Sequence, residues 1–385
     1  MRPSSRLLAL ACGNFALGTA SMSLIGLLNE IVAELELPVA QAGQLTGASY
    51  LMAALFAPLI AFFTRGLERR TVLILSLATT VAAQLASGLA AGFWSLFCAR
   101  LLLGCGIAAH SPTAAATSGL LVKPEQRGAA VSVVVAGFAV AGIAGVPLGV
   151  WFGGRFGWRW AMYINAAMVF GTLVWVWLTI PGRLPRSSLD AKAMGGVIRN
   201  RTLRGALVLT LAQSVGQMVV FTYLAPLLRE AVGAGPGTIA MLMSAMGLAS
   251  AAGSVVGVRF MDRVRPPSMM RAASVMVMAG MLVWPLAQGS VPLLVVLIVL
   301  WGAGGMIMFS SVTAHLLMAG QDMANVSLAL NTSANFFGSM AGSAVGGVLI
   351  SLFGLKALPW SCLLIYAGIY AAVPALTRKA APVRA

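Results

Sequence analysis

The sequence has 385 residues, of which 59% are hydrophobic and only 9% charged, with a mean hydropathy of +0.93. An ordinary soluble domain carries about 25% charged residues, so this composition excludes that class and indicates a membrane protein. A net charge of +16 is also found in nucleic-acid-binding proteins, but these cations lie between long apolar runs, so we expect no nucleic-acid partner.

The apolar residues form twelve runs, each long enough for a helix to cross a bilayer, which takes about 20 residues. The runs lack the alternation of apolar and polar residues that membrane barrel strands show, so we predict an all-α polytopic membrane protein. The first run is too long for a signal peptide and is interpreted as an uncleaved span. The predicted spans are 7–28, 43–63, 71–92, 94–117, 128–150, 160–181, 205–226, 237–258, 269–288, 292–314, 326–350 and 357–376.

The segments between the spans alternate between cation-rich and cation-poor. One set of alternate segments holds 20 of the 25 Lys and Arg residues, the other set holds 4, and Arg100 lies within a span. Cationic loops stay in the cytoplasm, so the pattern predicts that both termini are cytoplasmic in a bacterial inner membrane.

The longest polar stretch divides the spans six and six. We predict an N-terminal six-helix half at 1–182, a cytoplasmic linker at 183–204 and a C-terminal six-helix half at 205–385. A basic turn follows the second span of each half, and the fifth span of each half is rich in glycine. Two repeated halves are typical of secondary transporters, which bind substrate near the midplane between the halves.

Five stretches together carry a resemblance to a known family. They are Val39-Ala40-Gln41-Ala42-Gly43, the basic turn ending in Arg69-Arg70, Arg100-Leu101-Leu102-Leu103-Gly104-Cys105-Gly106, Gly145-Val146-Pro147-Leu148-Gly149 and Ala329-Leu330-Asn331-Thr332-Ser333. In this order they resemble the major facilitator superfamily, and more narrowly its twelve-span drug/proton antiporters, which include arabinose-efflux-like permeases. The resemblance implies a monomer that exports a small organic molecule, such as a drug, antibiotic or sugar, by alternating access.

Gating residues follow from the same resemblance. In the family, an acid and arginines in the turn after span 2 latch the two halves; here Arg69 and Arg70 remain, but Arg65 occupies the acidic position. The second copy of the turn keeps its acid as Asp262, beside Arg263. The alternative is that these charges only set topology. In span 5, Gly145, Pro147 and Gly149 predict close helix packing and a hinge.

Arg100 is the one cation placed within a span. A buried arginine normally faces a cavity or a partner, although this one lies in the outer third of its span and could reach outward instead. It matches the span-4 arginine that the family associates with proton coupling.

Polar residues on the spans expected to line the cavity are the substrate candidates. Gln213 and Gln217 are four residues apart and share a helix face, which favours a joint role. Hydrogen bonding between helices is the alternative for these amides and for Asn331 and Asn335, which we expect to pack against span 8. The full set of candidates is Asn14, Ser21, His110, Gln213, Gln217, Tyr223 and His315.

None of the nine acidic residues lies at mid-membrane depth in the predicted spans, whereas arabinose-efflux-like relatives keep a carboxylate pair after Phe-x-x-Gly-Thr in span 1. Here Phe15-Ala16-Leu17-Gly18-Thr19 is followed by Ala20-Ser21, and the nearest acid is Glu30 at the outer mouth. The sequence therefore leaves two alternatives for the energy source. Either protons are coupled to transport through Glu30 or a histidine, or the protein is an uncoupled facilitator or importer.

Other chemistry has little support in the sequence. The cysteines Cys12, Cys98, Cys105 and Cys362 all lie in predicted spans without metal-ligand spacing, and we expect neither a metal nor a cofactor. The chain has no phosphate-binding Gly-x-x-x-x-Gly-Lys-Ser/Thr loop for ATP. An intramembrane enzyme is a remote alternative, because no intramembrane carboxylate pair or His-Glu-x-x-His motif is present.

Overall fold

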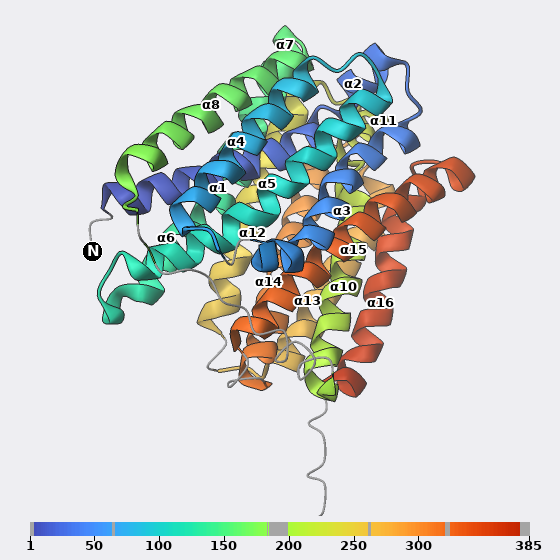
Figure 1. The fold of residues 1–385 in the computed structure, drawn as a ribbon. Helices are drawn as coiled ribbons and strands as arrows, with labels where there is room; N and C mark the ends of the chain where they lie inside the picture. The colour runs from blue at the N-terminus through green and yellow to red at the C-terminus, as the bar shows by residue number, and fades with distance from the viewer. Residues whose placement is uncertain are drawn as a thin grey trace, which may run out of the picture. The chain divides into compact units, whose positions relative to one another are not determined.

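A computed structural model describes residues 4–63, 66–182, 184, 199–260, 263–319 and 324–377 (Figure 1). These residues form helices joined by short connections and contain no strand. The first helices are α1 (Ser5–Gly26), α2 (Leu28–Leu35), α3 (Val39–Phe63), α4 (Arg69–Gly88) and α5 (Phe93–Leu120). A 3₁₀ turn (Pro124–Gln126), α6 (Arg127–Val140), a π-helical turn (Ala141–Gly145), α7 (Val146–Phe156) and α8 (Trp158–Thr179) follow.

The second series begins with α10 (Arg201–Phe221), α11 (Leu224–Val232) and α12 (Pro236–Arg259). It continues with α13 (Pro266–Val283), a 3₁₀ turn (Trp284–Ala287), α14 (Val291–Ala319), α15 (Ala324–Phe353) and α16 (Ala357–Leu376). Every predicted span coincides with a helix or with a series of consecutive helices. Among the described residues, 11 helices are long and apolar enough to cross a membrane, and α3 supplies the remaining predicted span. The prediction of an all-α polytopic fold is confirmed.

Spans 1 and 7 end earlier than predicted. We expected helices over 7–28 and 205–226, but α1 ends at Gly26 and α10 ends at Phe221. A short helix follows each break. Leu27 before α2 (φ −100°, ψ 11°) and Tyr223 before α11 (φ −111°, ψ 20°) have nearly the same backbone conformation. The hydropathy pattern missed these breaks because apolar residues continue across both of them.

The described residues form two compact units. One lies within Met1–Ser188 and Thr222–Gly247, and the other within Leu189–Phe221 and Leu248–Ala385. The first unit therefore includes α11 and the start of α12, which we had assigned by sequence to the C-terminal half. Residues 183 and 185–198 of the predicted linker lie outside the described residues, and the division at 183–204 stays a prediction.

Helix α1 is central to the first unit, where it contacts α5, α6 and α8. Glycine permits the closest approach: a side chain at Gly137 of α6 would collide with the Ala11 carbonyl of α1. In the second unit α10 lies against α15 and α16, and α13 lies against α14 (Figure 1). These two bundles hold the polar candidate residues in place.

Candidate functional site

Arg100 on α5 has no exposed surface and binds to the backbone of α1. One guanidinium nitrogen donates to the Ala20 carbonyl (3.2 Å) and the other to the Ser21 carbonyl (3.0 Å). Its Nε has no hydrogen-bond partner among the described residues. The guanidinium therefore points inward to α1 rather than outward to the membrane surface, and it ties α5 to α1 by two charge-assisted hydrogen bonds.

The α1 candidates Asn14 and Ser21 are both buried. The Ser21 hydroxyl donates to the Gly18 carbonyl within α1 (3.0 Å). The link from Ser21 to α5 is made instead by its backbone carbonyl, which accepts a hydrogen bond from Arg100. The Asn14 amide nitrogen donates to the Val134 carbonyl of α6 (2.9 Å). The Asn14 oxygen is buried without a partner among the described residues, so it is free to accept a hydrogen bond.

His110 on α5 is fully buried, and its ring lies against Gly13 of α1, where any side chain would collide with it. The Ser76 hydroxyl donates to the Leu73 carbonyl (2.8 Å) and lies 3.0 Å from His110 Nδ1. A hydroxyl has one proton to donate, so we assign the imidazole proton to Nδ1, which donates to Ser76. Nε2 is then an acceptor, and it has no partner among the described residues.

Span 5 is interrupted where the glycines and proline predicted a hinge. Pro147 has no N–H for the carbonyl four residues earlier, and the π-helical turn Ala141–Gly145 lies just before it. A side chain at Gly145 would collide with Thr19, and one at Gly149 would touch the Ser23 side chain of α1 at 3.4 Å. These glycines let the interrupted helix lie close to α1.

In the second unit, Gln213 and Gln217 of α10 both face Gly305 of α14. The Gln213 amide donates to the Gly305 carbonyl (3.3 Å), and a Cβ at Gly305 would lie 2.8 Å from the Gln217 oxygen. Tyr366 of α16 donates to that oxygen (3.4 Å). The Gln213 oxygen has no partner among the described residues. The structure thus brings the two amides together as their spacing predicted.

Asn331 and Asn335 of α15 bind to α10, which is the predicted span 7, and Asn331 also donates to Thr313 of α14 (3.4 Å); packing against span 8 stays a prediction. Thr210 donates to the Asn331 oxygen (2.6 Å), and the Asn335 amide donates to Ser214 (2.9 Å). Hydropathy identifies polar positions in a span but does not say which neighbouring helix they meet. These bonds fix α15 against the helix that carries the glutamines.

His315 lies apart from this network, toward the end of α14, and is half-buried. Its Nε2 is buried and has no hydrogen-bond partner among the described residues. The structure gives it no contact that indicates a role in proton transfer.

Tyr223 and Glu30 lie at a contact between the short helices α2 and α11. Tyr223 is fully buried, its hydroxyl donates to the Ala40 carbonyl of α3 (3.4 Å), and its ring covers Gly43. Burial raises the pKa of Glu30, while its own backbone N–H and the charge of Arg229 on α11 act in the opposite direction. Glu30 Oε2 is buried without a hydrogen-bond partner among the described residues.

The gating candidates are only partly described. Arg70 donates to the Trp177 carbonyl of α8 (2.6 Å), so it joins the start of α4 to the end of α8 within one unit. Arg69 is half-buried at the start of the same helix, and Arg263 is exposed. Asp262, the acid of the second basic turn, lies outside the described residues.

Among the substrate candidates, three buried acceptor atoms without a described partner were not recognisable from sequence as a set. They are Asn14 Oδ1, His110 Nε2 and Gln213 Oε1. The sequence signal was only the presence of polar residues in spans; which atom of each side chain is left unbonded depends on the neighbouring helices.

Comparison with known proteins agrees with this architecture. The family model described as Major Facilitator Superfamily matches residues 10–316 and 206–384. The chain belongs to the major facilitator superfamily. It is therefore a multi-pass membrane transporter rather than an enzyme, and the intramembrane-enzyme alternative no longer applies.

Curated relatives of this transporter cover different shares of the chain. The chain is 30% identical to the uncharacterized MFS-type transporter YtbD of Bacillus subtilis. The aligned 259 residues are 67% of this chain and 65% of that protein. The chain is 24% identical to the inner membrane transport protein YdhP of Escherichia coli over 91% of this chain and 90% of that protein. A chloramphenicol resistance protein of Streptomyces lividans is 29% identical over 72% of this chain and 70% of its own length.

A solved structure shows the same fold. The crystal structure of a D-xylose-proton symporter aligns with a TM-score of 0.78 at 16% identity, covering 97% of this chain and 98% of that one. The fold is therefore that of a major facilitator transporter.

Arg100→Ala is expected to reduce transport at least ten-fold, although the protein still reaches the membrane. The substitution removes both hydrogen bonds that tie α5 to α1, each worth about 1.5–3 kcal/mol. Membrane protein level and flux in vesicles would be measured together. Arg155→Ala, at an exposed position near the end of α7, is the matched control. Normal flux with Arg100→Ala would show that Arg100 has no part in transport.

Proposed function

We propose that this transporter exports a small, uncharged organic molecule with hydrogen-bond donors, working as a monomer by alternating access with both termini in the cytoplasm. The observation that carries the proposal is the set of buried acceptors on α1, α5 and α10. Leaving such an atom unbonded costs about 1–3 kcal/mol, so its retention is explained if a substrate or water binds it during transport.

The charge of the interior favours a substrate without positive charge. The described carboxylates are all at helix ends, in short helices or in connections, namely Glu30, Glu34, Glu36, Glu68, Glu125 and Glu230. None is available inside a span to compensate a bound cation, whereas Arg100 is buried there. A cationic substrate would therefore lose its hydration without gaining a counter-charge.

Export of a drug-like molecule is supported by the relative named as a chloramphenicol resistance protein. Apolar surroundings with a few placed polar groups are typical of sites for small organic ligands. Amide and hydroxyl donors on such a molecule would suit the acceptors of Asn14, His110 and Gln213. Sugars also carry such donors, and remain a second substrate class in this proposal.

Movement between states is proposed to involve the interrupted fifth span and the short helices. The π-helical turn before Pro147 is a place where a helix bends with little loss of hydrogen bonding. Helices α2 and α11 contact each other, with Tyr223 against α3. Separation of α2 from α11 would open the outer mouth near Glu30. The basic turns with Arg69, Arg70 and Arg263 would act on the cytoplasmic side.

Proton antiport is the proposed source of energy, with Glu30 as the responsive group. The charge of Arg229 on α11 acts on Glu30, and Glu230 follows Arg229 in the same helix. Glu34 shares a helix with Glu30, whereas α3 has no charged residue and α1 has only Arg6 at its far end. An uncoupled facilitator or an importer is the alternative, since the described spans contain no internal carboxylate.

Expression in a susceptible bacterium is expected to raise resistance to neutral amphiphiles such as chloramphenicol several-fold and to leave resistance to quaternary ammonium compounds unchanged. The interior supplies acceptors but no counter-charge for a cation. Resistance and export from loaded vesicles, with and without a proton gradient, would be measured for both classes. Export of the quaternary compounds would contradict the proposed selectivity, and export that ignores the gradient would contradict antiport.

Glu30→Gln is expected to remove the dependence of flux on external pH that arises above the ordinary pKa range of a glutamate, because burial raises the pKa of Glu30. Burial raises the pKa of Glu30, so the α2–α11 contact favours the protonated acid; the contact is more stable at low pH and weakens as pH rises through that raised pKa. Glutamine resembles the protonated acid at every pH.

Glu34→Gln is the matched control for this experiment. Glu34 lies on the same helix but forms an exposed ion pair with Arg159 (2.7 Å). The control is expected to keep the wild-type pH profile. If both variants keep that profile, the assignment of proton response to Glu30 is wrong.

A further inference from the structure

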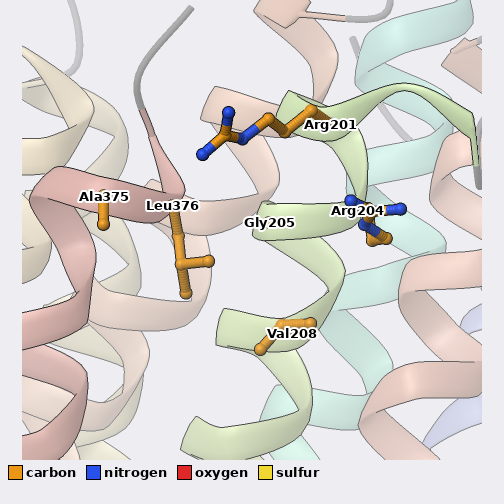
Figure 2. A pocket seen from close by; sticks show the side chains of 6 residues that line it. All are labelled: Arg201, Arg204, Gly205, Val208, Ala375 and Leu376. Atoms are coloured by element: carbon orange, nitrogen blue, oxygen red, sulfur yellow. The ribbon is translucent and has the colours of Figure 1, made fainter.

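A pocket opens between the start of α10 and the end of α16 (Figure 2). Its lining consists of Arg201, Arg204, Gly205, Val208, Ala375 and Leu376. It lies away from the glutamine network, at the ends of two helices that each span the membrane by length and composition. Nothing in the transport proposal uses it.

Two guanidinium groups form the polar part of this pocket. Arg201 and Arg204 are three residues apart, so they share a face of α10, and both are exposed. Figure 2 shows the Arg201 side chain extending from α10 toward the end of α16. Neither arginine forms an ion pair with a described residue, since the one ion pair among those residues is Arg159–Glu34.

Among the described residues, the second unit contains no carboxylate. Every described carboxylate belongs to the first unit, and the acids whose sequence positions fall in the second unit, Asp190, Asp262 and Asp322, lie outside the described residues. The two guanidinium groups extend in different directions from the start of α10 (Figure 2), and each can donate hydrogen bonds to a phosphate, which accepts several from arginine.

The rest of the pocket lining is apolar, and a further exposed apolar residue follows it on α10. Gly205 allows α10 to lie close to α16, because a Cβ at this position would collide with the backbone of Leu376 in the last turn of α16. Val208 is 48% exposed, and Leu211, one turn further on, is 42% exposed. The spacing 201, 204, 208 and 211 follows one face of the helix, so the charged groups lie directly above an exposed apolar strip.

We propose that this pocket binds one anionic phospholipid, with its phosphate between Arg201 and Arg204 and its acyl chain along Val208 and Leu211. The position at the ends of two spanning helices places the arginines at headgroup level and the apolar strip within the hydrocarbon. Basic pockets between membrane helices bind anionic headgroups in this way. A free phosphate would use only the arginines, and the apolar strip would then have no role in binding.

The test is native mass spectrometry of the purified full-length protein with phosphatidylglycerol, phosphatidylcholine or glycerol phosphate. The double variant Arg201→Gln/Arg204→Gln is expected to weaken phosphatidylglycerol binding about thirty-fold, since each arginine near the surface contributes about five-fold. Phosphatidylcholine is expected to bind weakly to both proteins. Thermal unfolding with and without each lipid shows that the variant is folded.

Arg263→Gln/Arg265→Gln is the matched control, because it removes the same charge from exposed positions that do not line the pocket. Retained phosphatidylglycerol binding in this control, with loss in the first variant, supports the site. Equal loss in both variants would show general surface attraction and overturn it. Glycerol phosphate binding as tightly as the lipid would overturn the lipid assignment. The readout is lipid binding, so it does not depend on whether the transport proposal is right.

Discussion

A positive charge with no access to water is the constraint on which the N-terminal bundle depends. Hydrocarbon supplies no hydrogen bonds, so Arg100 has to find acceptors within the protein. It finds them in the backbone carbonyls of Ala20 and Ser21, which retain a lone pair beyond that used in the helix. This contact fixes α5 against α1, and α1 in turn contacts α6 and α8. Position and register of several helices thus follow from one side chain.

The second unit meets the same constraint with neutral groups. Thr210 and Ser214 of α10 bind Asn331 and Asn335 of α15, and Gln213 binds the backbone of α14. These bonds orient α10 so that the face with its glutamines lies toward Gly305 of α14. Each unit thus keeps unbonded acceptors inside its own bundle; the first unit also carries the buried Arg100, and no described carboxylate lies inside a span of either unit. Such an interior favours an uncharged substrate, which is why charge, rather than shape, is the basis of the proposed selectivity.

Much of the fold could be predicted from sequence, because a bilayer imposes length and hydropathy on every spanning helix. The breaks at Leu27 and Tyr223 could not, since apolar residues continue across both. For the site, the spacing of Gln213 and Gln217 correctly predicted a shared face. The carbonyl partners of Arg100 and the pairing of Asn331 and Asn335 with α10 depend on tertiary packing, which residue spacing does not encode.

The central proposal is that the unbonded acceptor of Asn14 on α1 is reached by the substrate during transport. The most direct measurement is labelling of Asn14→Cys by a membrane-impermeant maleimide, in a protein whose Cys12, Cys98, Cys105 and Cys362 are replaced by serine or alanine. The account predicts that the new thiol is labelled in membranes during transport and that a transported neutral amphiphile slows labelling several-fold. No labelling from either side of the membrane, or labelling that the substrate leaves unchanged, would contradict it.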